Sequence, residues 1–190
     1  MEPIKTDFVL DAKGLSCPMP IVKTKKLMKE LKAGQVIEIQ ATDRGSKADL
    51  KAWADSGGHQ YLGTIEEGEV LKHYLRKASE EEIEEKNHPN VINNEELENV
   101  LYSKSNVLLL DVREAAEYAF DHIPGAVSIP LGELNEKIQE LDREKEIYVI
   151  CRTGRRSDLA AQKLAENGFK NVVNVIPGMS QWSGKTEKSY

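Results

Sequence analysis

The sequence predicts an α/β protein of two domains: a two-layer βαβαββ sandwich at residues 1–77 and a three-layer domain with a parallel sheet at residues 91–190. Three observations lead to this prediction. The chain has 190 residues, enough for two domains that each bury a modest core. An acidic stretch at residues 78–90, ASEEEIEEKNHPN, has the composition of a linker. The apolar segments on either side of it follow two different patterns of strands and helices.

The N-terminal segment reads as two strand-helix units followed by a pair of strands. The first helix carries its apolar side chains on one face, and Gly34 is its stop signal. Gly57 and Gly58 end the second helix in the same way. Two helices covering one face of a small sheet satisfy this pattern. In chain order, the expected elements are a strand at 8–10, a helix at 18–32, a strand at 36–41, a helix at 46–55, and strands near 60–64 and 69–76.

The C-terminal segment alternates strands and helices more regularly. Strands that alternate with helices form a parallel sheet with helices on both faces, so three layers are expected. Gly168 is the stop signal of the last helix. The expected elements are a helix at 94–103, a strand at 107–110, a helix at 114–119, a strand at 126–129, a helix at 132–141, a strand at 147–150, a helix at 157–167 and a strand at 172–176.

Charge and hydropathy restrict the class of function. The net charge is −6 and 31% of residues are charged, which does not favour nonspecific binding to nucleic acid or to an anionic membrane. No apolar run approaches the ~20 residues of a membrane span, and the first residues lack the apolar core of a signal peptide. We therefore expect a cytoplasmic protein without a direct membrane or nucleic-acid partner. Lysines on the first helix are interpreted as solvated surface, with a docking patch for an acidic partner or RNA as the alternative: Lys23, Lys25, Lys26, Lys29 and Lys32.

The chain contains two cysteines, Cys17 and Cys151, which lie far apart in the sequence. Neither belongs to a Cys-x-x-Cys pattern or to a Cys/His spacing, and the four histidines are scattered. A structural disulfide or a zinc site is therefore not expected, and we predict no bound metal. A lone thiol is either a core residue or a reactive group, and the residues around each cysteine decide between the two.

Cys17 lies in the run GLSCPMP at residues 14–20, at the start of the first helix. Proline is favoured at the first helical position, so Pro18 is expected to make Cys17 the N-cap. The free amides of Met19 and Ile21 and the helix dipole would then favour a thiolate, which predicts a lowered pKa. The alternative is a buried cysteine that happens to precede a helix. It is less favoured, because Ser, Thr, Asp and Asn are the usual caps.

Cys151 lies in the run CRTGRRS, between an apolar strand and a helix. A strand, a tight loop and a helix N-terminus in that order direct backbone N–H groups toward one atom. Gly154 permits the backbone conformation of such a turn. Arg152, Arg155 and Arg156 add positive charge for an anionic sulfur or an incoming oxyanion. These features stabilise a thiolate and a persulfide anion equally; the alternative is a charged surface turn with an incidental cysteine.

The N-terminal run DAKGLSCPMP at residues 11–20, together with the βαβαββ order, resembles the TusA/SirA family of sulfur-carrier proteins. The resemblance covers residues 5–77. It implies that Cys17 carries a persulfide, and that Pro18 and Pro20 shape the turn that presents it.

The C-terminal segment resembles the rhodanese family in three motifs in the correct order. CRTGRRS matches the active-site loop Cys-x-x-Gly-x-Arg, DVREAAEY with HIPGA resembles the first signature, and GMSQW resembles the closing motif. Asp121 and Pro177 stand where the family usually has glycine. The resemblance implies a rhodanese-like fold with Cys151 as the nucleophile. The residues expected to hold its persulfide are Arg152, Thr153, Gly154, Arg155, Arg156 and Ser157.

The length of the Cys151 loop bears on the substrate class. Counting from Cys151 to Arg156 gives six residues, which resembles the sulfur-handling loop of the superfamily. Its phosphatase and arsenate-reductase relatives carry a longer loop, and a shorter ring of amides suits a single sulfur atom better than a tetrahedral oxyanion. Asp111 and Arg113 are expected to support the fold through an internal ion pair.

Together, the two resemblances imply a sulfurtransferase. Cys151 would take sulfane sulfur from thiosulfate or glutathione persulfide and pass it to a thiol acceptor, either directly or through Cys17. Transfer between the two thiols in the reverse direction is an alternative. A cysteine desulfurase as donor, or a protein acceptor, is an expected partner, and no cofactor is expected beyond the covalent persulfides. The alternative is a thiol-based sensor or adaptor of reactive sulfur species without efficient turnover.

Overall fold

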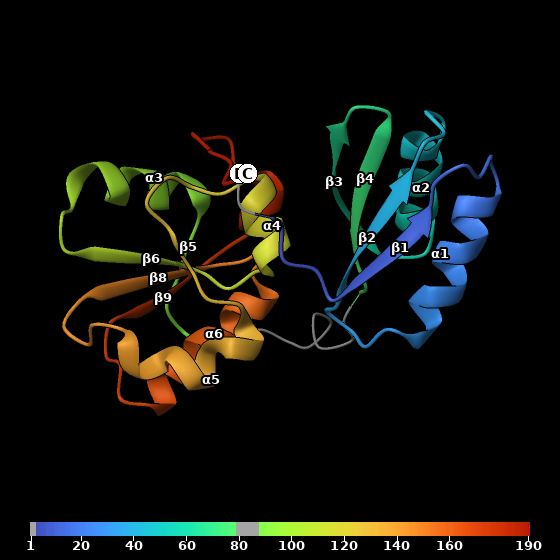
Figure 1. Cartoon of the computed structure of the whole chain (residues 1–190). Helices are drawn as coiled ribbons and strands as arrows, with labels where there is room; N and C mark the ends of the chain where they lie inside the picture. The colour runs from blue at the N-terminus through green and yellow to red at the C-terminus, as the bar shows by residue number, and fades with distance from the viewer. Residues whose placement is uncertain (1–2, 79–87) are drawn as a thin grey trace. The chain divides into compact units, whose positions relative to one another are not determined.

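A computed structural model of the chain describes residues 3–78 and 88–190. These two ranges belong to two compact units (Figure 1). The acidic linker predicted at residues 78–90 falls mostly on residues outside the described ranges, so its boundaries stay a prediction. Within the described residues, no helix is long and apolar enough to cross a membrane.

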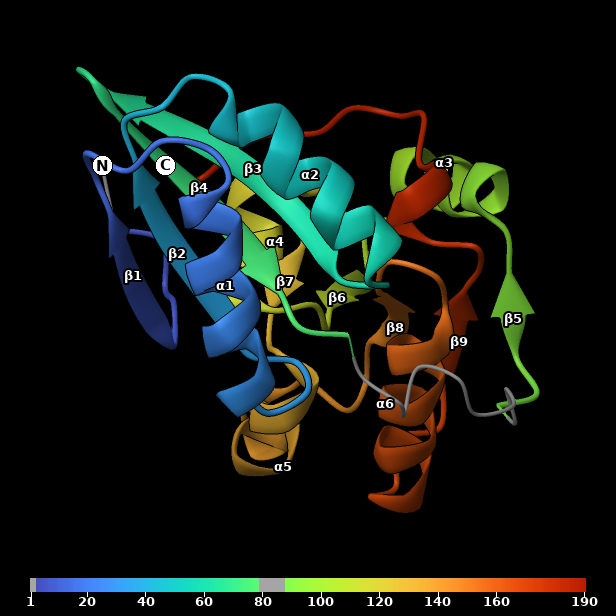
Figure 2. The same cartoon turned by 90° about the vertical axis from the view of Figure 1, so that its right-hand side faces the viewer.

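The N-terminal unit has the predicted βαβαββ order. Its four strands lie in the order β1-β2-β4-β3, with β1 parallel to β2 and the other neighbours antiparallel. Both helices cover the same face of this sheet, as Figure 2 shows. The two-layer sandwich is therefore confirmed. Its elements are β1 (Phe8–Ala12), α1 (Met19–Glu30), β2 (Val36–Ala41), α2 (Ser46–Ser56), β3 (Gln60–Glu67) and β4 (Val70–Arg76).

The register of this sheet brings the ends of several elements together. Ala12 at the end of β1 pairs with Ala41 at the end of β2, and Ala41 pairs with Leu71 near the start of β4. The loop that carries Cys17 follows β1, and the loop that leads into α2 follows β2. Both loops therefore leave the sheet at the same end. Ile37 and Ile39 of β2 are fully buried in the apolar cluster that holds this unit together.

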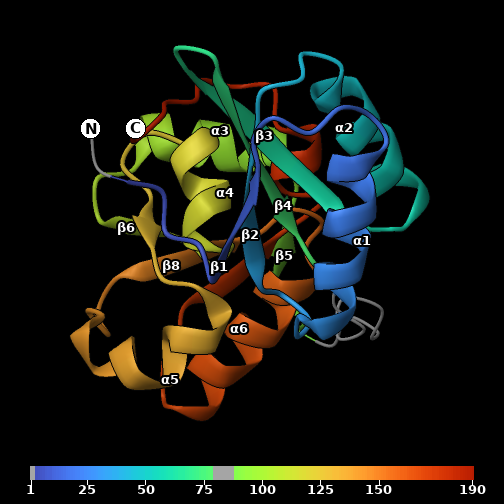
Figure 3. The same ribbon diagram turned by 45° about the vertical axis from the view of Figure 1, so that its right-hand side comes forward.

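The C-terminal unit is a five-stranded sheet in the order β5-β9-β8-β6-β7, with every pair parallel. Figure 3 shows α3 and α4 over one face of the sheet and α5 and α6 over the other. This confirms the predicted three-layer architecture. Its elements are β5 (Val91–Ile92), α3 (Asn94–Ser103), β6 (Val107–Asp111), α4 (Ala115–Phe120), β7 (Val127–Ser128), α5 (Leu134–Lys137), β8 (Glu146–Ile150), α6 (Arg155–Glu166) and β9 (Val172–Val175).

The central strand β8 shows why the sheet must be covered on both faces. Ile147 and Val149 belong to one buried apolar cluster, while Tyr148 and Ile150 belong to another. Because both sets of alternating side chains are buried, the strand reads as a continuous apolar run. It ends at Ile150, so the next residue stands at the carboxyl end of the central strand, where open α/β sheets bind their ligands.

Two predictions in this unit were wrong in detail. The single helix expected at 132–141 is broken into a 3-10 turn, the four-residue α5 and a second 3-10 turn. Gly132, a weak helix former, lies in the first of these turns, and Pro130 directly precedes it. The strand β5 was missed because two residues are too few to show a period.

Candidate functional site

The Cys151 loop joins β8 to α6, and α6 begins two residues earlier than predicted, at Arg155. Gly154 precedes the helix with φ at 87°, a left-handed conformation that favours glycine. This conformation turns the Gly154 N–H toward the Cys151 sulfur, which accepts it at 3.1 Å. The loop thus supplies a main-chain donor to the sulfur, as the strand-loop-helix pattern predicted.

A second contact reaches the same sulfur from Ser157. Its Oγ lies 3.3 Å from Cys151 Sγ and donates to Asn174 Oδ1 at 2.6 Å. Because the single Ser157 hydroxyl proton goes to Asn174, the neutral Cys151 thiol is the donor to Ser157. When Cys151 loses its proton, rotation of this hydroxyl supplies a donor to the thiolate. Ser157 can therefore hydrogen-bond to the sulfur whether Cys151 is a thiol or a thiolate.

Asn174 is a site residue that the sequence analysis missed. It lies on β9, is fully buried, and also donates from Nδ2 to the Gly154 carbonyl at 3.0 Å. One amide side chain thus binds both residues that contact the Cys151 sulfur, Gly154 through its carbonyl and Ser157 through its hydroxyl. The available signal was a polar residue inside the apolar strand VVNV, since a buried polar side chain requires partners.

The closing motif packs directly against the Cys151 loop. Met179 N donates to the Cys151 carbonyl and Ser180 N donates to the Arg152 carbonyl, both at 2.8 Å. A Cβ atom on Gly178 would lie 2.4 Å from the Cys151 carbonyl oxygen, so only glycine fits there. Asn94 at the start of α3 holds Gly178 through its N–H and its carbonyl. The closing motif therefore holds the loop through the main-chain carbonyls of Cys151 and Arg152.

The arginines of the loop do not all lie as expected. Arg156 was predicted to hold the persulfide, but its Nη1 and Nη2 donate to the two Glu117 carboxylate oxygens at 2.7 and 2.9 Å. This bidentate ion pair joins α6 to α4 and directs the guanidinium to α4, which corrects the prediction. Arg152 is exposed and Arg155 is half-buried. Neither makes an ion pair with any other residue in the described ranges, so these two keep the predicted role of attracting an anion. Thr153, the remaining predicted persulfide contact, is half-buried.

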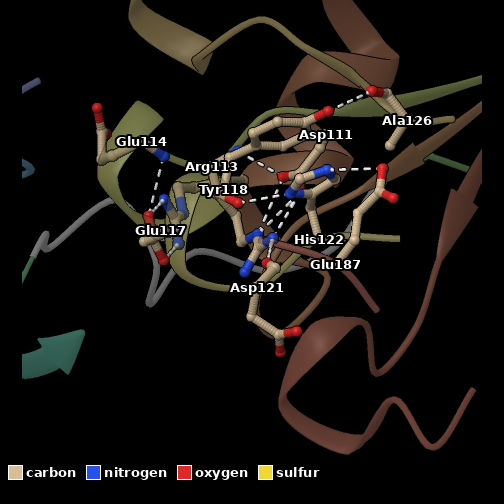
Figure 4. A network of polar contacts seen from close by, with 10 residues as sticks. Asp111, Arg113, Glu114, Glu117, Tyr118, Asp121, His122, Ala126 and Glu187 are labelled. Carbon is tan, nitrogen blue, oxygen red and sulfur yellow. Dashed lines mark hydrogen bonds and ion pairs between the residues drawn. The ribbon is translucent and has the colours of Figure 1, made fainter. Parts of the chain in front are cut away.

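Asp111 and Arg113 form the predicted internal ion pair (Figure 4). Arg113 Nη2 lies 2.6 Å from Asp111 Oδ2 and also donates to the Asp121 carbonyl at 2.7 Å. Asp121 is extended, with φ at −166°, and receives this bond through its main chain. The backbone conformation is open to any residue, so the usual glycine is not required at this position.

Cys17 lies in the turn between β1 and α1, and its side chain is exposed. The predicted cap was wrong by one residue: Pro18 occupies the N-cap position and α1 begins at Met19. The Met19 N–H donates to the Ser16 carbonyl at 3.0 Å, so this amide is not available to the Cys17 sulfur. The Met19 amide therefore does not act on the thiol as expected. Pro20, in the first turn of α1, is buried, and with Pro18 it shapes this turn.

Two carboxylates act on Cys17 instead. A hydrogen bond to Asp49 is the largest cause that raises the pKa of the Cys17 thiol, followed by desolvation and the negative charges of Asp49 and Asp43. Asp43 Oδ2 accepts the Cys17 N–H at 2.9 Å, and Oδ1 accepts the Gly45 N–H. These backbone bonds lower the pKa of Asp43 and keep it ionised. The prediction of a lowered Cys17 pKa is thus wrong. The two carboxylates belong to the segment at the start of α2, which is distant from Cys17 in the sequence.

In the described residues, no group of three or more His, Cys, Asp or Glu side chains could hold a metal.

Known proteins with similar sequences or structures agree with this geometry. The family model "Sulfurtransferase TusA" matches residues 8–77, and the model "Rhodanese-like domain" matches residues 93–185. "Putative sulfur carrier protein YrkF" of Bacillus subtilis (strain 168) is 55% identical over 184 residues, which are 97% of this chain and 100% of that protein. "Putative sulfur carrier protein YrkI" of the same organism is 58% identical over 75 residues, 40% of this chain and 100% of that protein.

A solved structure of a rhodanese-like domain protein from Staphylococcus aureus superimposes with a TM-score of 0.50 at 30% identity. The match covers 53% of this chain and 99% of that one. The two family models lie in the same order as the two compact units, and the match to YrkF spans almost the whole chain. The chain therefore belongs to the family of sulfur carrier proteins in which a TusA domain is followed by a rhodanese-like domain.

Proposed function

We propose that this protein is a sulfurtransferase in which Cys151 takes sulfane sulfur from a small donor, such as thiosulfate or glutathione persulfide, and passes it to Cys17. The observation that carries the proposal is the pair of contacts at Cys151 Sγ, with Gly154 N at 3.1 Å and Ser157 Oγ at 3.3 Å. Both groups can donate to a sulfur anion at the carboxyl end of the central strand. Arg152 and Arg155 add positive charge to attract an anionic donor.

The first step balances as a displacement on sulfur. The Cys151 thiolate attacks the sulfane sulfur of thiosulfate, a new sulfur-sulfur bond forms, and the old one breaks with its electron pair leaving on sulfite. The outcome is a Cys151 persulfide and sulfite, with no net oxidation. The Gly154 N–H and the rotated Ser157 hydroxyl stabilise the charge on sulfur before and after this step.

The second step transfers the sulfane sulfur to Cys17. The Cys17 thiol gives its proton to the terminal sulfur of the Cys151 persulfide anion, and the resulting Cys17 thiolate attacks that sulfur. The sulfur-sulfur bond to Cys151 breaks, and Cys151 leaves as a thiolate. The raised pKa of Cys17 supports this direction, because a thiolate of higher pKa is the stronger nucleophile and the poorer leaving group. Cys17 is exposed, so the loaded thiol is accessible to an acceptor thiol or to a protein acceptor, and the empty thiol to a protein donor such as a cysteine desulfurase.

The alternative function, a thiol-based sensor of reactive sulfur species, gains less support. Cysteines that sense oxidants react at neutral pH because their pKa is low, and the pKa of the exposed Cys17 is raised. A thiol that stays protonated until a donor is at hand suits a carrier better than a sensor.

Intact-protein mass spectrometry after thiosulfate treatment tests the relay. We expect the mass of one added sulfur on Cys17 in the chain with both thiols, and none on Cys17 in the Cys151→Ser variant. Chemical reduction before the measurement is the control, because it removes a persulfide but not a sulfinic acid, which adds nearly the same mass. Equal loading of Cys17 in the absence of Cys151 would disprove the proposed order of transfer.

A further inference from the structure

His73 is a buried histidine that the proposed chemistry does not use. It lies on β4, on the face that α1 and α2 cover, and is fully buried. Burial is the main cause that lowers the pKa of His73 to about 4, with a smaller contribution from the charge of Lys47. The imidazole is therefore neutral at physiological pH, and its two nitrogens have different roles, one as donor and one as acceptor.

The hydrogen bonds around His73 determine which nitrogen carries the proton. Ser46 Oγ lies 2.8 Å from Nε2 and donates its own proton to the Asp43 carbonyl at 2.5 Å. Ser46 must therefore accept from His73, so Nε2 carries the proton. On the other side, the Tyr61 and Thr64 hydroxyls both lie 2.9 Å from Nδ1, which accepts from one of them. These two hydroxyls also contact each other.

The same chain of bonds continues from Ser46 to Cys17. Ser46 is the first residue of α2, and the Asp43 carbonyl accepts both its hydroxyl and its N–H, the latter at 3.1 Å. The Asp43 carboxylate in turn accepts the Cys17 N–H at 2.9 Å. Asp49 lies in the first turn of α2. Both carboxylates that surround the Cys17 thiol are thus attached to the segment that Ser46 and His73 hold.

We propose that His73 is a positioning residue for the Cys17 thiol. As the neutral tautomer with the proton on Nε2, it orients the Ser46 hydroxyl, which fixes the Asp43 turn and the start of α2 against the Cys17 loop. This inference rests on the proposed function only in taking Cys17 as the thiol that carries sulfur. The competing interpretation is a core histidine whose hydrogen bonds are satisfied locally and have no effect on Cys17.

The pH dependence of Cys17 alkylation by iodoacetamide distinguishes the two interpretations. Every variant is made with Cys151→Ser, so that a single thiol reacts. We expect His73→Leu and Ser46→Ala to release the carboxylates, lower the Cys17 pKa by about half a unit, and raise the alkylation rate at pH 7 about threefold. Above the thiol pKa the rates converge, because the thiol is then ionised in every variant.

Two matched variants make the test specific. His73→Gln places an N–H donor near the position of Nε2, and we expect it to restore the parent pH profile. Thr64→Val removes a contact on the far side of the ring and leaves Tyr61 to donate to Nδ1, so its profile should match the parent. Circular dichroism verifies folding, and Ser46→Ala keeps the test decisive if His73→Leu does not fold.

The inference is overturned if folded Ser46→Ala keeps the parent profile, or if His73→Gln shifts the profile as far as His73→Leu does. Alkylation needs no sulfur donor, so this result is independent of whether Cys151 passes sulfur to Cys17. Failure of the relay would appear in the mass spectra instead, with the alkylation profiles unchanged.

Discussion

The two cysteines stand before helices in similar sequence contexts, yet their surroundings differ. Cys151 is buried, and its sulfur meets a main-chain N–H and a hydroxyl. Cys17 is exposed, and its neighbours are two carboxylates that raise its pKa. The first setting places hydrogen-bonding groups against the sulfur, and the second favours a protonated thiol. The local sequence before a helix therefore does not determine the reactivity of a cysteine. The elements that fold against the cysteine determine it.

The largest expected effect tests which thiol carries the catalytic step. Replacing Cys151 by Ser removes the nucleophile, so turnover of thiosulfate with a small thiol acceptor should fall on the order of a thousandfold or more. Cys17→Ser should keep most of this turnover, because the small acceptor replaces Cys17 as the recipient. Sulfite release measures both. A similar loss of turnover in both variants would disprove the separate roles proposed for the two thiols.

A glycine in each region tests how tightly the two loops are held. Gly178 beside Cys151 and Gly14 in the Cys17 turn both have positive φ, at 86° and 75°. An added Cβ meets the Cys151 carbonyl at Gly178, whereas none of the surrounding atoms lies within 4 Å at Gly14. Gly14→Ala should therefore cost only the backbone strain, about 1 kcal/mol, and Gly178→Ala about 3 kcal/mol or more.

Urea unfolding measures these costs separately, because each unit contains one of the two tryptophans, Trp53 and Trp182. Fluorescence of Trp182 follows Gly178→Ala, and fluorescence of Trp53 follows Gly14→Ala. Equal losses of unfolding free energy would mean that the close packing behind Cys151 contributes nothing beyond the backbone conformation.

The smallest expected effect concerns the charge beside Cys17. Asp49 raises the thiol pKa, so Asp49→Ala should lower it and increase the thiolate fraction at pH 7. A shift of about half a unit corresponds to roughly threefold faster alkylation, in the chain that also carries Cys151→Ser. Asp55→Ala is the matched control, since Asp55 is exposed on the same helix. Identical rates for the two variants would show that Asp49 does not set the reactivity of Cys17.

The sequence predicted the order of the elements because apolar periodicity is a local property, and most strands and helices carry several periods. It also predicted the Cys151 loop, since strand, glycine and helix follow one another within a few residues. It could not predict the direction of the Arg156 side chain, which depends on Glu117 on another helix. The prediction of the Cys17 pKa failed for the same reason, because the fold alone brings Asp43 and Asp49 close to the thiol.

The turn around Cys17 is bound to Asp43 through a main-chain group of Cys17. The bond to Asp43 comes from the Cys17 N–H, and that group is the same whether the side chain ends in a thiol or in a persulfide. In the proposed relay, loading and unloading would therefore exchange one sulfur atom without removing the backbone group that binds Asp43. In that relay, the added sulfur and the contact between the thiol and Asp49 are what differ between the full and the empty carrier, so an acceptor would recognise the loaded state there.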